Sequence, residues 1–193
     1  MLNLKIILSS TREGRKGPSI ANWIYDYAVK HGEFNVELID LQKVNLPFMD
    51  EPNHPKQQRY IHQHTRDWSA MIGPADAFIF VAPEYNYGMP ATLKNAIDFL
   101  YNEWSYKPVG IVSYGGLSAG TRSAQMLKLV CNAVKMVPLT EGVNLAFFNK
   151  NINEQGIFIS SELIDKSAEA MMNELHQWAP VLKAKRELAV TKS

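Results

Sequence analysis

Five short apolar runs recur along the chain, and segments of helix length separate them. The runs are Leu4–Ser9, Asn35–Asp40, Ala77–Ala82, Pro108–Ser113 and Gly142–Phe147. The first, third and fourth runs are almost continuously apolar, which is typical of central parallel strands that are covered on both faces. Because strands and helices alternate, the connections should be right-handed crossovers. The pattern predicts a three-layer α/β sandwich around a five-stranded parallel sheet, with 2-1-3-4-5 as the leading strand order.

The segments between the runs carry apolar residues at helical spacing. The predicted helices are Ser19–His31, Gln57–Ile72, Ala91–Leu100, Thr121–Val134 and Ser161–Lys185. The stretch Leu41–Gln57 contains three prolines and few regular signals, so we expect a long surface loop near the active edge of the sheet. No repeat or linker divides the chain, and its 193 residues are most simply one domain, residues 1–193.

The composition excludes several classes of protein. With 46% hydrophobic residues and a formal net charge of +1, the chain indicates neither disorder nor electrostatic capture of nucleic acid, so its partner should be a small molecule or a second copy. The single cysteine, Cys131, excludes an internal disulfide or a cysteine metal cluster and fits a reducing, cytoplasmic setting. The N-terminal apolar stretch is too short for a signal peptide, and no segment approaches the roughly 20 apolar residues that span a bilayer. We therefore expect a soluble protein with no membrane partner.

Ligands of open α/β sheets bind beyond the carboxyl ends of the strands, near the point where the strand order reverses. This rule selects three loops, Ser9–Ser19, Pro83–Pro90 and Ser113–Arg122. The first loop carries hydroxyl groups and two arginines just before a helix N-terminus, whose unpaired N–H groups favour a phosphate monoester. It has neither the Walker spacing nor the Gly-x-Gly-x-x-Gly dinucleotide fingerprint. Asp40, at the end of the second strand, is interpreted as a strand-end or helix-cap residue.

The second and third loops suit a planar ligand. Tyr85 and Tyr87 flank Asn86 on a strand-to-helix turn that water should reach, and their rings offer flat walls that still carry a hydroxyl. Gly115 and Gly116 permit close approach of the backbone, although glycine pairs are ordinary in such turns. Together the three loops indicate a ligand with a phosphate at one end and a planar, hydrogen-bonding ring system at the other. FMN is the obvious candidate.

The stretch PEYNYGMPATLKNAIDFL, Pro83–Leu100, resembles a signature of the NADPH-dependent FMN reductases, Pro-Glu-Tyr-Asn-x-x-x-Pro-x-x-Leu-Lys-Asn-Ala-Ile-Asp. That family has a flavodoxin-like fold and includes quinone, azo-dye and chromate reductases. The loop Ser9–Ser19 is similar to the family's Gly-Ser-x-Arg phosphate loop, and VSYGG resembles its third flavin loop. Two departures stand out, because Ser9 replaces the usual glycine and the loop after Arg12 is longer and more basic. The similarity covers roughly Leu4 to Leu145.

The resemblance implies three groups of cofactor-binding residues. The FMN phosphate would be held by Ser10, Arg12 and Ser19, together with the backbone amide of Thr11. The isoalloxazine would be lined by Pro83, Glu84, Tyr85, Asn86 and Tyr87. Its other edge would be closed by Ser113, Tyr114, Gly115 and Gly116. No side chain is expected to act as a catalytic acid or base, because hydride transfer is the flavin's own chemistry.

The same resemblance implies an NAD(P)H oxidoreductase that works by a ping-pong cycle. Hydride would pass from NADPH, or NADH, to FMN, and a quinone-like or other small acceptor would then take two electrons. The resemblance also implies a homodimer or homotetramer. Arg15 and Lys16 have two equally supported interpretations, attraction of the extra phosphate of NADPH or a solvated basic loop.

Two alternative functions compete with the reductase. The first is an FMN-binding electron carrier or redox-sensing regulator without NAD(P)H turnover. The balanced charge and the arginines of the first loop disfavour it, because such carriers have a strongly acidic surface. The second is a receiver module, which would need a phosphorylatable aspartate after the third strand, where Pro83–Asn86 stands.

Other reactive or aromatic residues are expected to be structural. His62 and His64 are two positions apart on a predicted helix, so they should point to different faces, which does not suit paired metal ligands. We expect no metal site. Cys131 lies in an apolar helical segment and is interpreted as a small core residue. The aromatic segment Tyr101–Tyr106 fits an oligomer interface and core packing about equally well.

Overall fold

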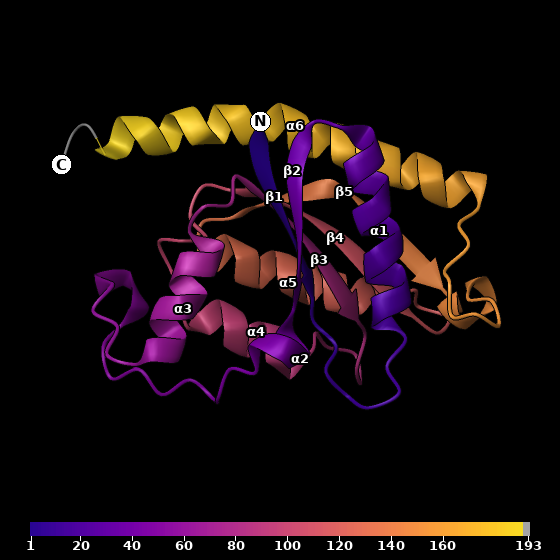
Figure 1. The fold of residues 1–193 in the computed structure, drawn as a ribbon, viewed down its shortest axis with the longest axis horizontal. Coiled ribbons are helices and arrows are strands. Elements are labelled where there is room, and N and C mark those ends of the chain that lie inside the picture. The colour runs from indigo at the N-terminus through magenta and orange to yellow at the C-terminus, as the bar shows by residue number, and fades with distance from the viewer. Residues whose placement is uncertain (191–193) are drawn as a thin grey trace.

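The computed structural model describes residues 1–190, with side chains through residue 188. Five parallel strands form one sheet in the order β2-β1-β3-β4-β5, so the predicted topology is confirmed (Figure 1). The strands are β1 (Leu2–Leu8), β2 (Phe34–Asp40), β3 (Ala77–Pro83), β4 (Pro108–Gly115) and β5 (Val137–Ala146). The strand order reverses between β1 and β3, and the loops that follow these two strands meet there.

Helices cover both faces of the sheet. They are α1 (Gly17–His31), α2 (Leu41–Val44), α3 (Gln63–Ile72), α4 (Ala91–Asp98), α5 (Thr121–Ala133) and α6 (Glu162–Val190), with short 3-10 helices η1 (Pro55–Gln57) and η2 (Phe148–Asn151). Helices α1 and α6 lie on one face, and α3, α4 and α5 lie on the other (Figure 1). No helix in the described part of the chain is both long and apolar enough to cross a membrane.

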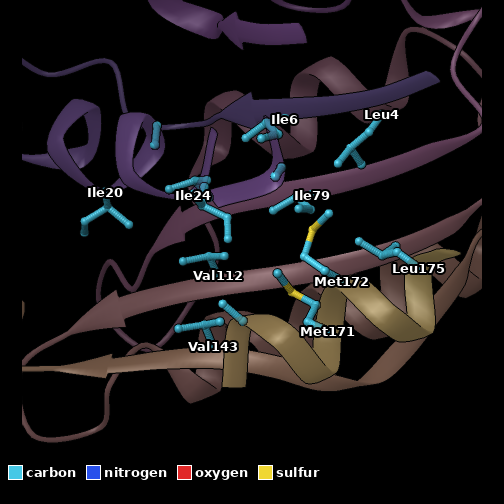
Figure 2. Close-up of a cluster of buried hydrophobic side chains, with 14 of the residues drawn as sticks. Leu4, Ile6, Ile20, Ile24, Ile79, Val112, Val143, Met171, Met172 and Leu175 are labelled. Carbon is cyan, nitrogen blue, oxygen red and sulfur yellow. The ribbon is translucent and has the colours of Figure 1, made fainter. Parts of the chain in front are cut away.

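The strand β3 shows why the central runs are continuously apolar. Because alternate side chains point to opposite faces, Ile79 and Val81 join the core under α1 and α6, while Phe78 and Phe80 join the core under the other helices. Figure 2 shows the first of these cores, in which Ile79 lies among side chains of α1 and α6. Each face therefore has its own buried cluster, and the sheet is a rigid platform for the loops at its edge.

The second predicted helix begins six residues later than its sequence pattern indicates. The pattern places a helix over Gln57–Ile72, but α3 starts at Gln63 and η1 ends at Gln57. The carboxylate of Glu51 accepts hydrogen bonds from the N–H groups of Ile61 and His62, both at 3.0 Å. These amides are thereby satisfied without a helical turn, and His62 becomes the extended residue that precedes α3.

This shift also overturns the prediction that His62 and His64 point to different faces. Their rings are stacked, with centroids 5.1 Å apart and an interplanar angle of 8°. Both rings face Asp50, and the His64 Nε2 lies 2.9 Å from its carboxylate. The prediction is wrong because His62 has an extended backbone rather than a helical one.

The other boundary differences are smaller. Strand β5 begins at Val137, five residues before the predicted start, and α6 continues past the predicted end at Lys185. Within the aromatic segment Tyr101–Tyr106, Trp104 is fully buried and its ring lies 5.0 Å from that of Phe78, so it belongs to the core. Cys131 is also buried, as predicted.

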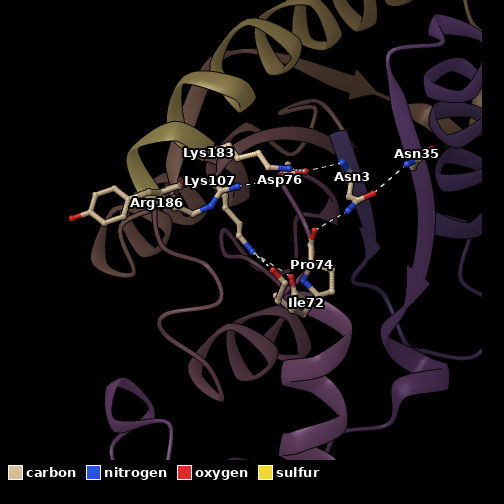
Figure 3. A network of polar contacts seen from close by, with 10 residues as sticks. Asn3, Asn35, Ile72, Pro74, Asp76, Lys107, Lys183 and Arg186 are labelled. Carbon is tan, nitrogen blue, oxygen red and sulfur yellow. Dashed lines mark hydrogen bonds and ion pairs between the residues drawn. The ribbon is translucent and has the colours of Figure 1, made fainter. Parts of the chain in front are cut away.

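A polar network ties α6 to the edge of the sheet opposite the ligand-binding loops. Asp76 accepts hydrogen bonds from the Asn3 N–H at 3.0 Å and from Arg186 at 2.8 Å, and Lys183 lies 3.3 Å from it (Figure 3). Beside this network, the buried Lys107 donates to the carbonyl oxygen of Gly73 at the end of α3. The far end of α6 is thus fixed to β1 and to the segment before β3.

Candidate functional site

The carboxyl ends of the strands surround a cavity of about 450 Å³. Its walls come from the three predicted loops and from the segment after β5. The lining residues are Arg12, Arg15, Lys16, Pro83, Glu84, Tyr85, Tyr114, Gly115, Gly116, Phe147, Phe148, Asn149 and Lys150. The fold therefore brings residues of the three loops, which are far apart in the sequence, into one site.

The remaining predicted residues lie around this cavity rather than in its lining. Ser10 is buried beneath the first loop, and Ser113 is buried at the end of β4, where its hydroxyl donates to Asn144 at 2.8 Å. Thr11 lines a second cavity of about 290 Å³ between α2 and α4. Ser19 is half-buried in the first turn of α1. Asn86 and Tyr87 are exposed at the tip of the second loop.

One end of the cavity is suited to an anion. The Ser10 side chain is 1% exposed, yet its hydroxyl has no hydrogen-bond partner. It lies beside the N-terminus of α1, which carries partial positive charge; Pro18 has no N–H there, and the Ser19 N–H donates to the Lys16 carbonyl oxygen at 3.2 Å. A Cβ atom at Gly17 would lie 2.6 Å from the Tyr114 hydroxyl oxygen and closer still to Ser10 Oγ, so only glycine lets the helix come this near. An unsatisfied buried hydroxyl beside a helix N-terminus is a cradle for an anionic oxygen.

Arg15 holds the first loop in shape. Its guanidinium binds both carboxylate oxygens of Asp40, at 2.7 and 2.6 Å, and also donates to the Ser10 carbonyl oxygen and to Gln42. Burial opposes ionisation of Asp40, but the hydrogen bonds from Arg15 and from the Gln42 N–H outweigh it and lower the Asp40 pKa. Asp40 also caps α2 through that N–H, so its interpretation as a helix-cap residue is confirmed.

The ion pair between Arg15 and Asp40 changes the interpretation of the basic loop. Its side chain is 10% exposed and is neutralised by Asp40, so it is not a solvated cation. Arg12 and Lys16 make no ion pair among the described residues, and the Arg12 guanidinium lies 5.7 Å from the centroid of the Tyr85 ring. Arg12 is therefore available to a ligand that reaches both the cradle and Tyr85.

The second loop is a tight turn. Tyr85 and Gly88 exchange backbone hydrogen bonds of 3.0 and 2.9 Å, and both Asn86 and Tyr87 have positive φ, 48° and 70°. This geometry is tolerated by asparagine but costs free energy for a tyrosine. Tyr87 is 71% exposed, and the Arg122 guanidinium lies over one face of its ring, 3.9 Å from the centroid.

Glu84 fastens the second loop to the third. Its carboxylate accepts hydrogen bonds from Ser118 at 2.9 Å and from the side chain and N–H of Arg122 at 2.6 and 3.1 Å. Burial opposes ionisation, but these bonds outweigh it and lower the Glu84 pKa. The Glu84 N–H also donates to the Tyr114 carbonyl oxygen at 3.0 Å. The carboxylate and the N–H of Glu84 are thus both occupied within the protein, and they hold the second loop against the third.

Tyr114 faces the anion end of the cavity. Its side chain is 4% exposed and packs edge-on against Phe148, with ring centroids 4.9 Å apart. Its hydroxyl lies beside Ser10, but the two are not aligned as a hydrogen bond. Burial is the main reason that its pKa rises to about 12. The group is a neutral phenol at physiological pH and can donate a hydrogen bond.

Sequence reasoning missed the wall formed by Phe147, Phe148, Asn149 and Lys150. These residues follow β5, and the Phe147 N–H donates to the Gly116 carbonyl oxygen at 3.2 Å, which joins them to the third loop. We refer to Phe147–Lys150 as the fourth loop. A signal was present, because the fifth strand of a parallel sheet ends at the same edge as the others. The predicted strand includes Phe147, and the residues Phe148–Asn151 after it carry no glycine or hydroxyl that would indicate a binding loop.

The strand order defines a flavodoxin-like α/β protein, and the anion cradle with the aromatic cavity beside it suits a planar ligand that carries a phosphate. The sequence matches the family model described as NADPH-dependent FMN reductase over residues 2–150. The chain belongs to this family, so it is an oxidoreductase whose cofactors are FMN and NAD(P)H.

Named relatives support this assignment. Over 133 residues the chain is 43% identical to the NAD(P)H-dependent FMN reductase C4B3.06c of Schizosaccharomyces pombe, and the match covers 68% of this chain and 66% of the relative. It is 35% identical over 153 residues to the NAD(P)H-dependent FMN reductase ntnL of Nectria sp, covering 76% of each chain. The solved structure of FerB, a flavoenzyme NAD(P)H:(acceptor) oxidoreductase from Paracoccus denitrificans, superimposes with a TM-score of 0.74. It is 18% identical and covers 93% of this chain and 98% of its own, so it shows the shared fold.

The residues present fit FMN. The unpaired Ser10 hydroxyl and the α1 N-terminus suit a phosphate monoester, and Arg12 supplies a cation beside them. At the other end, the space beside Gly116 is open, with no heavy atom within 4 Å of where a Cβ atom would stand. Because nothing projects there, the edge of a flat ring system can approach the backbone of the third loop.

Proposed function

We propose that the protein reduces quinone-like or other small acceptors with electrons from NAD(P)H, by a ping-pong cycle at bound FMN. The observation that carries this proposal is that one cavity joins an anion cradle to an aromatic and glycine-lined wall. One site on one flavin would serve donor and acceptor in turn. FMN, when bound, supplies the hydride acceptance and the delivery of two electrons.

In this proposal the side chains of the protein bind and orient the cofactor. Ser10, Arg12 and Ser19, with the Thr11 amide, would hold the phosphate, and Tyr114 would donate to it from the side. The backbone of the second and third loops would face the ring system, with Tyr85 as a flat wall. No acid or base in the lining is required, since Glu84 is held as a carboxylate by Arg122.

The remaining predicted residues take supporting places. Pro83 and Gly115 line the cavity beside the proposed ring position, and Asn86 and Tyr87 form its outer rim. Ser113 would orient the third loop, because its hydroxyl oxygen lies 2.9 Å from the Ala119 carbonyl oxygen and 2.8 Å from the Asn144 side chain, and its single proton can be donated to either. These roles support the binding of a planar ligand without a reactive side chain.

The choice of acceptor class is supported by relatives. The chain is 24% identical over 185 residues to a 2-hydroxy-1,4-benzoquinone reductase from Burkholderia sp, covering 92% of this chain and 96% of the relative. Over a shorter stretch of 59 residues it is 42% identical to an NADPH:quinone oxidoreductase of Arabidopsis thaliana. A quinone is flat and accepts two electrons at once, so it suits the cavity that the donor has left.

Anaerobic stopped-flow absorbance tests the function. NADPH should bleach the flavin absorbance of the purified protein on the timescale of turnover, and a quinone added afterwards should restore it. An electron carrier or a regulator would bind FMN but would show no bleaching at that rate, and this result would refute the reductase. Ranking quinones, azo compounds and free flavins by kcat/KM would then identify the acceptor class.

The assembly and location are proposed with the function. Exposed apolar side chains lie on the second and third loops, at Tyr87 and Leu117, which supports a homodimer or homotetramer whose partner covers this face. A reducing, cytoplasmic location is supported by the single cysteine, which is buried and unpaired. Light scattering after size-exclusion chromatography would give the oligomeric state.

A further inference from the structure

The cavity has more positive charge than a flavin phosphate needs. Among its lining residues in the described chain, Arg15 is neutralised by Asp40, and Glu84 is neutralised by Arg122. Arg12, Lys16 and Lys150 line the same cavity and form no ion pair among the described residues. Two of these cations, Arg12 and Lys16, belong to the first loop, beside the cradle. Lys150 belongs to the fourth loop.

Lys150 comes from a different strand end than the cradle. The cradle follows β1 and Lys150 follows β5, and β3 and β4 lie between these strands in the sheet. The fourth loop nevertheless reaches toward the cradle, because Phe148 packs against Tyr114, whose hydroxyl lies beside Ser10. A dianionic phosphate at Ser10 is balanced by Arg12 and Lys16 beside it, so Lys150 is the third cation of the cavity and is left for a second anion.

The backbone of Lys150 is fixed relative to the flavin loops. Its N–H donates to the Phe147 carbonyl oxygen at 2.9 Å, and the Phe147 N–H donates to Gly116 in the third loop. The Lys150 Nζ lies 5.3 Å from the centroid of the Phe147 ring, a cation–π contact between two residues that line the cavity. Phe147 itself has a positive φ of 46°, a conformation that a bulky residue adopts only when its surroundings impose it.

We propose that Lys150 binds the 2′-phosphate of NADPH and makes the protein prefer NADPH to NADH. This proposal rests on the function proposed above, in which a reduced nicotinamide nucleotide enters the same cavity. NADPH differs from NADH by one dianionic group, and an unpaired ammonium on the cavity wall is a suitable partner for it. Because Lys150 is exposed, the contact should weaken as salt is added.

The test compares two adenosine nucleotides on the FMN-loaded protein. Adenosine 2′,5′-bisphosphate carries the 2′-phosphate, and adenosine 5′-monophosphate lacks it. In Lys150→Gln we expect the Kd of the bisphosphate, measured by calorimetry, to rise about tenfold, because a charge-assisted hydrogen bond is lost. The Kd of the monophosphate and the amount of bound FMN should not change. The ratio of kcat/KM for NADPH to that for NADH should fall by the same factor.

Two lysine variants separate a local contact from a general charge effect. Lys16→Gln removes the same charge from the cradle side of the cavity, and Lys166→Gln removes it from an exposed position on α6, where Lys166 pairs with Glu162. Neither should alter the discrimination between the two nucleotides. An equal loss in Lys16→Gln, an equal rise for both nucleotides, or loss of FMN from Lys150→Gln would each overturn the proposal.

The nucleotide comparison needs no turnover. If NADPH fails to bleach the flavin, the proposed function fails, whatever the calorimetry shows. If bleaching is normal but Lys150→Gln binds the bisphosphate as the unaltered protein does, only the assignment of Lys150 fails.

Discussion

Tyr114 is the residue whose side-chain position differs most from what its motif implies. The resemblance assigns Tyr114, with Gly115 and Gly116, to the edge of the isoalloxazine, whereas its side chain turns toward Ser10 and Gly17. Strand alternation explains the difference, because the side chain of Tyr114 points to the α1 face of β4 and joins that core. A signature predicts which residues lie at a site, but the direction of a side chain depends on the pleat.

We expect Tyr114→Phe to weaken the binding of FMN more than that of riboflavin. Phenylalanine keeps the ring against Phe148 and removes only the donor, so the Kd of FMN should rise about five- to tenfold while that of riboflavin stays nearly constant. Flavin fluorescence titration measures both values. Tyr25→Phe, on the half-buried surface of α1, serves as the control. Equal changes for the two flavins would show that the hydroxyl does not contact the phosphate.

The Arg15–Asp40 pair should make stability depend on acidity. The Asp40 pKa is lowered in the folded protein, so the pair contributes its full stability above about pH 4 and loses it as the pH falls below that value. Asp40→Asn leaves a largely covered guanidinium without its carboxylate, and we expect the free energy of unfolding at about pH 7 to fall by about 1–3 kcal/mol.

Urea unfolding at about pH 7, 5 and 3 checks this prediction. The variant should lose less stability than the unaltered protein between about pH 5 and about pH 3, because it has no carboxylate to protonate. Asp98→Asn, on the exposed face of α4, is the matched control. If the unaltered protein and Asp40→Asn lost the same stability between about pH 5 and about pH 3, the assigned role would be contradicted.

At the scale of elements, periodicity predicted the helices and strands whose positions depend on packing. It failed where a single side chain sets the boundary of a helix. The alternation in β3 and the helical spacing in α1 both reflect burial, and both elements were found where the sequence indicates. The start of α3 depends instead on one carboxylate, that of Glu51, which reaches across ten residues to hold two amides. No local pattern contains this contact.

The fourth loop was missed for a related reason. The motif-bearing loops after β1, β3 and β4 have glycines, hydroxyls or a long signature, and they were predicted to meet. Phe147–Lys150 has no such signature. Only the position of β5 beside β4 in the sheet places this loop at the cavity. Its link to Gly116 is a backbone hydrogen bond, which depends on conformation and leaves no trace in residue types.

At the scale of the whole molecule, the carboxyl and amino edges of the sheet differ in how their charges are paired. The carboxyl edge keeps an unpaired hydroxyl and uncompensated cations for ligands, whereas the amino edge pairs its charges, with Asp76 between Lys183 and Arg186. Lys107 is the exception at the amino edge. It is buried, its Nζ lies 5.6 Å from the Phe78 ring centroid, and burial is the main reason that its pKa falls to about 7. The positive charge of Arg186 lowers the pKa further, while Asp76 and Glu103 oppose the shift.

Lys107 should therefore make the whole fold more stable as the pH rises above neutrality. An unfolded lysine keeps its proton to about pH 10.4, so between about pH 7 and about pH 10 the unfolded chain binds more protons than the folded one. Stability then rises with pH, by up to about 1.4 kcal/mol for each pH unit. Lys107→Met keeps the apolar stem and removes the titrating group, so its free energy of urea unfolding should be flat across about pH 7, 8 and 9. Lys166→Met, at an exposed position, should retain the rise. A rise in Lys107→Met as steep as in the unaltered protein would show that Lys107 remains charged in the folded state.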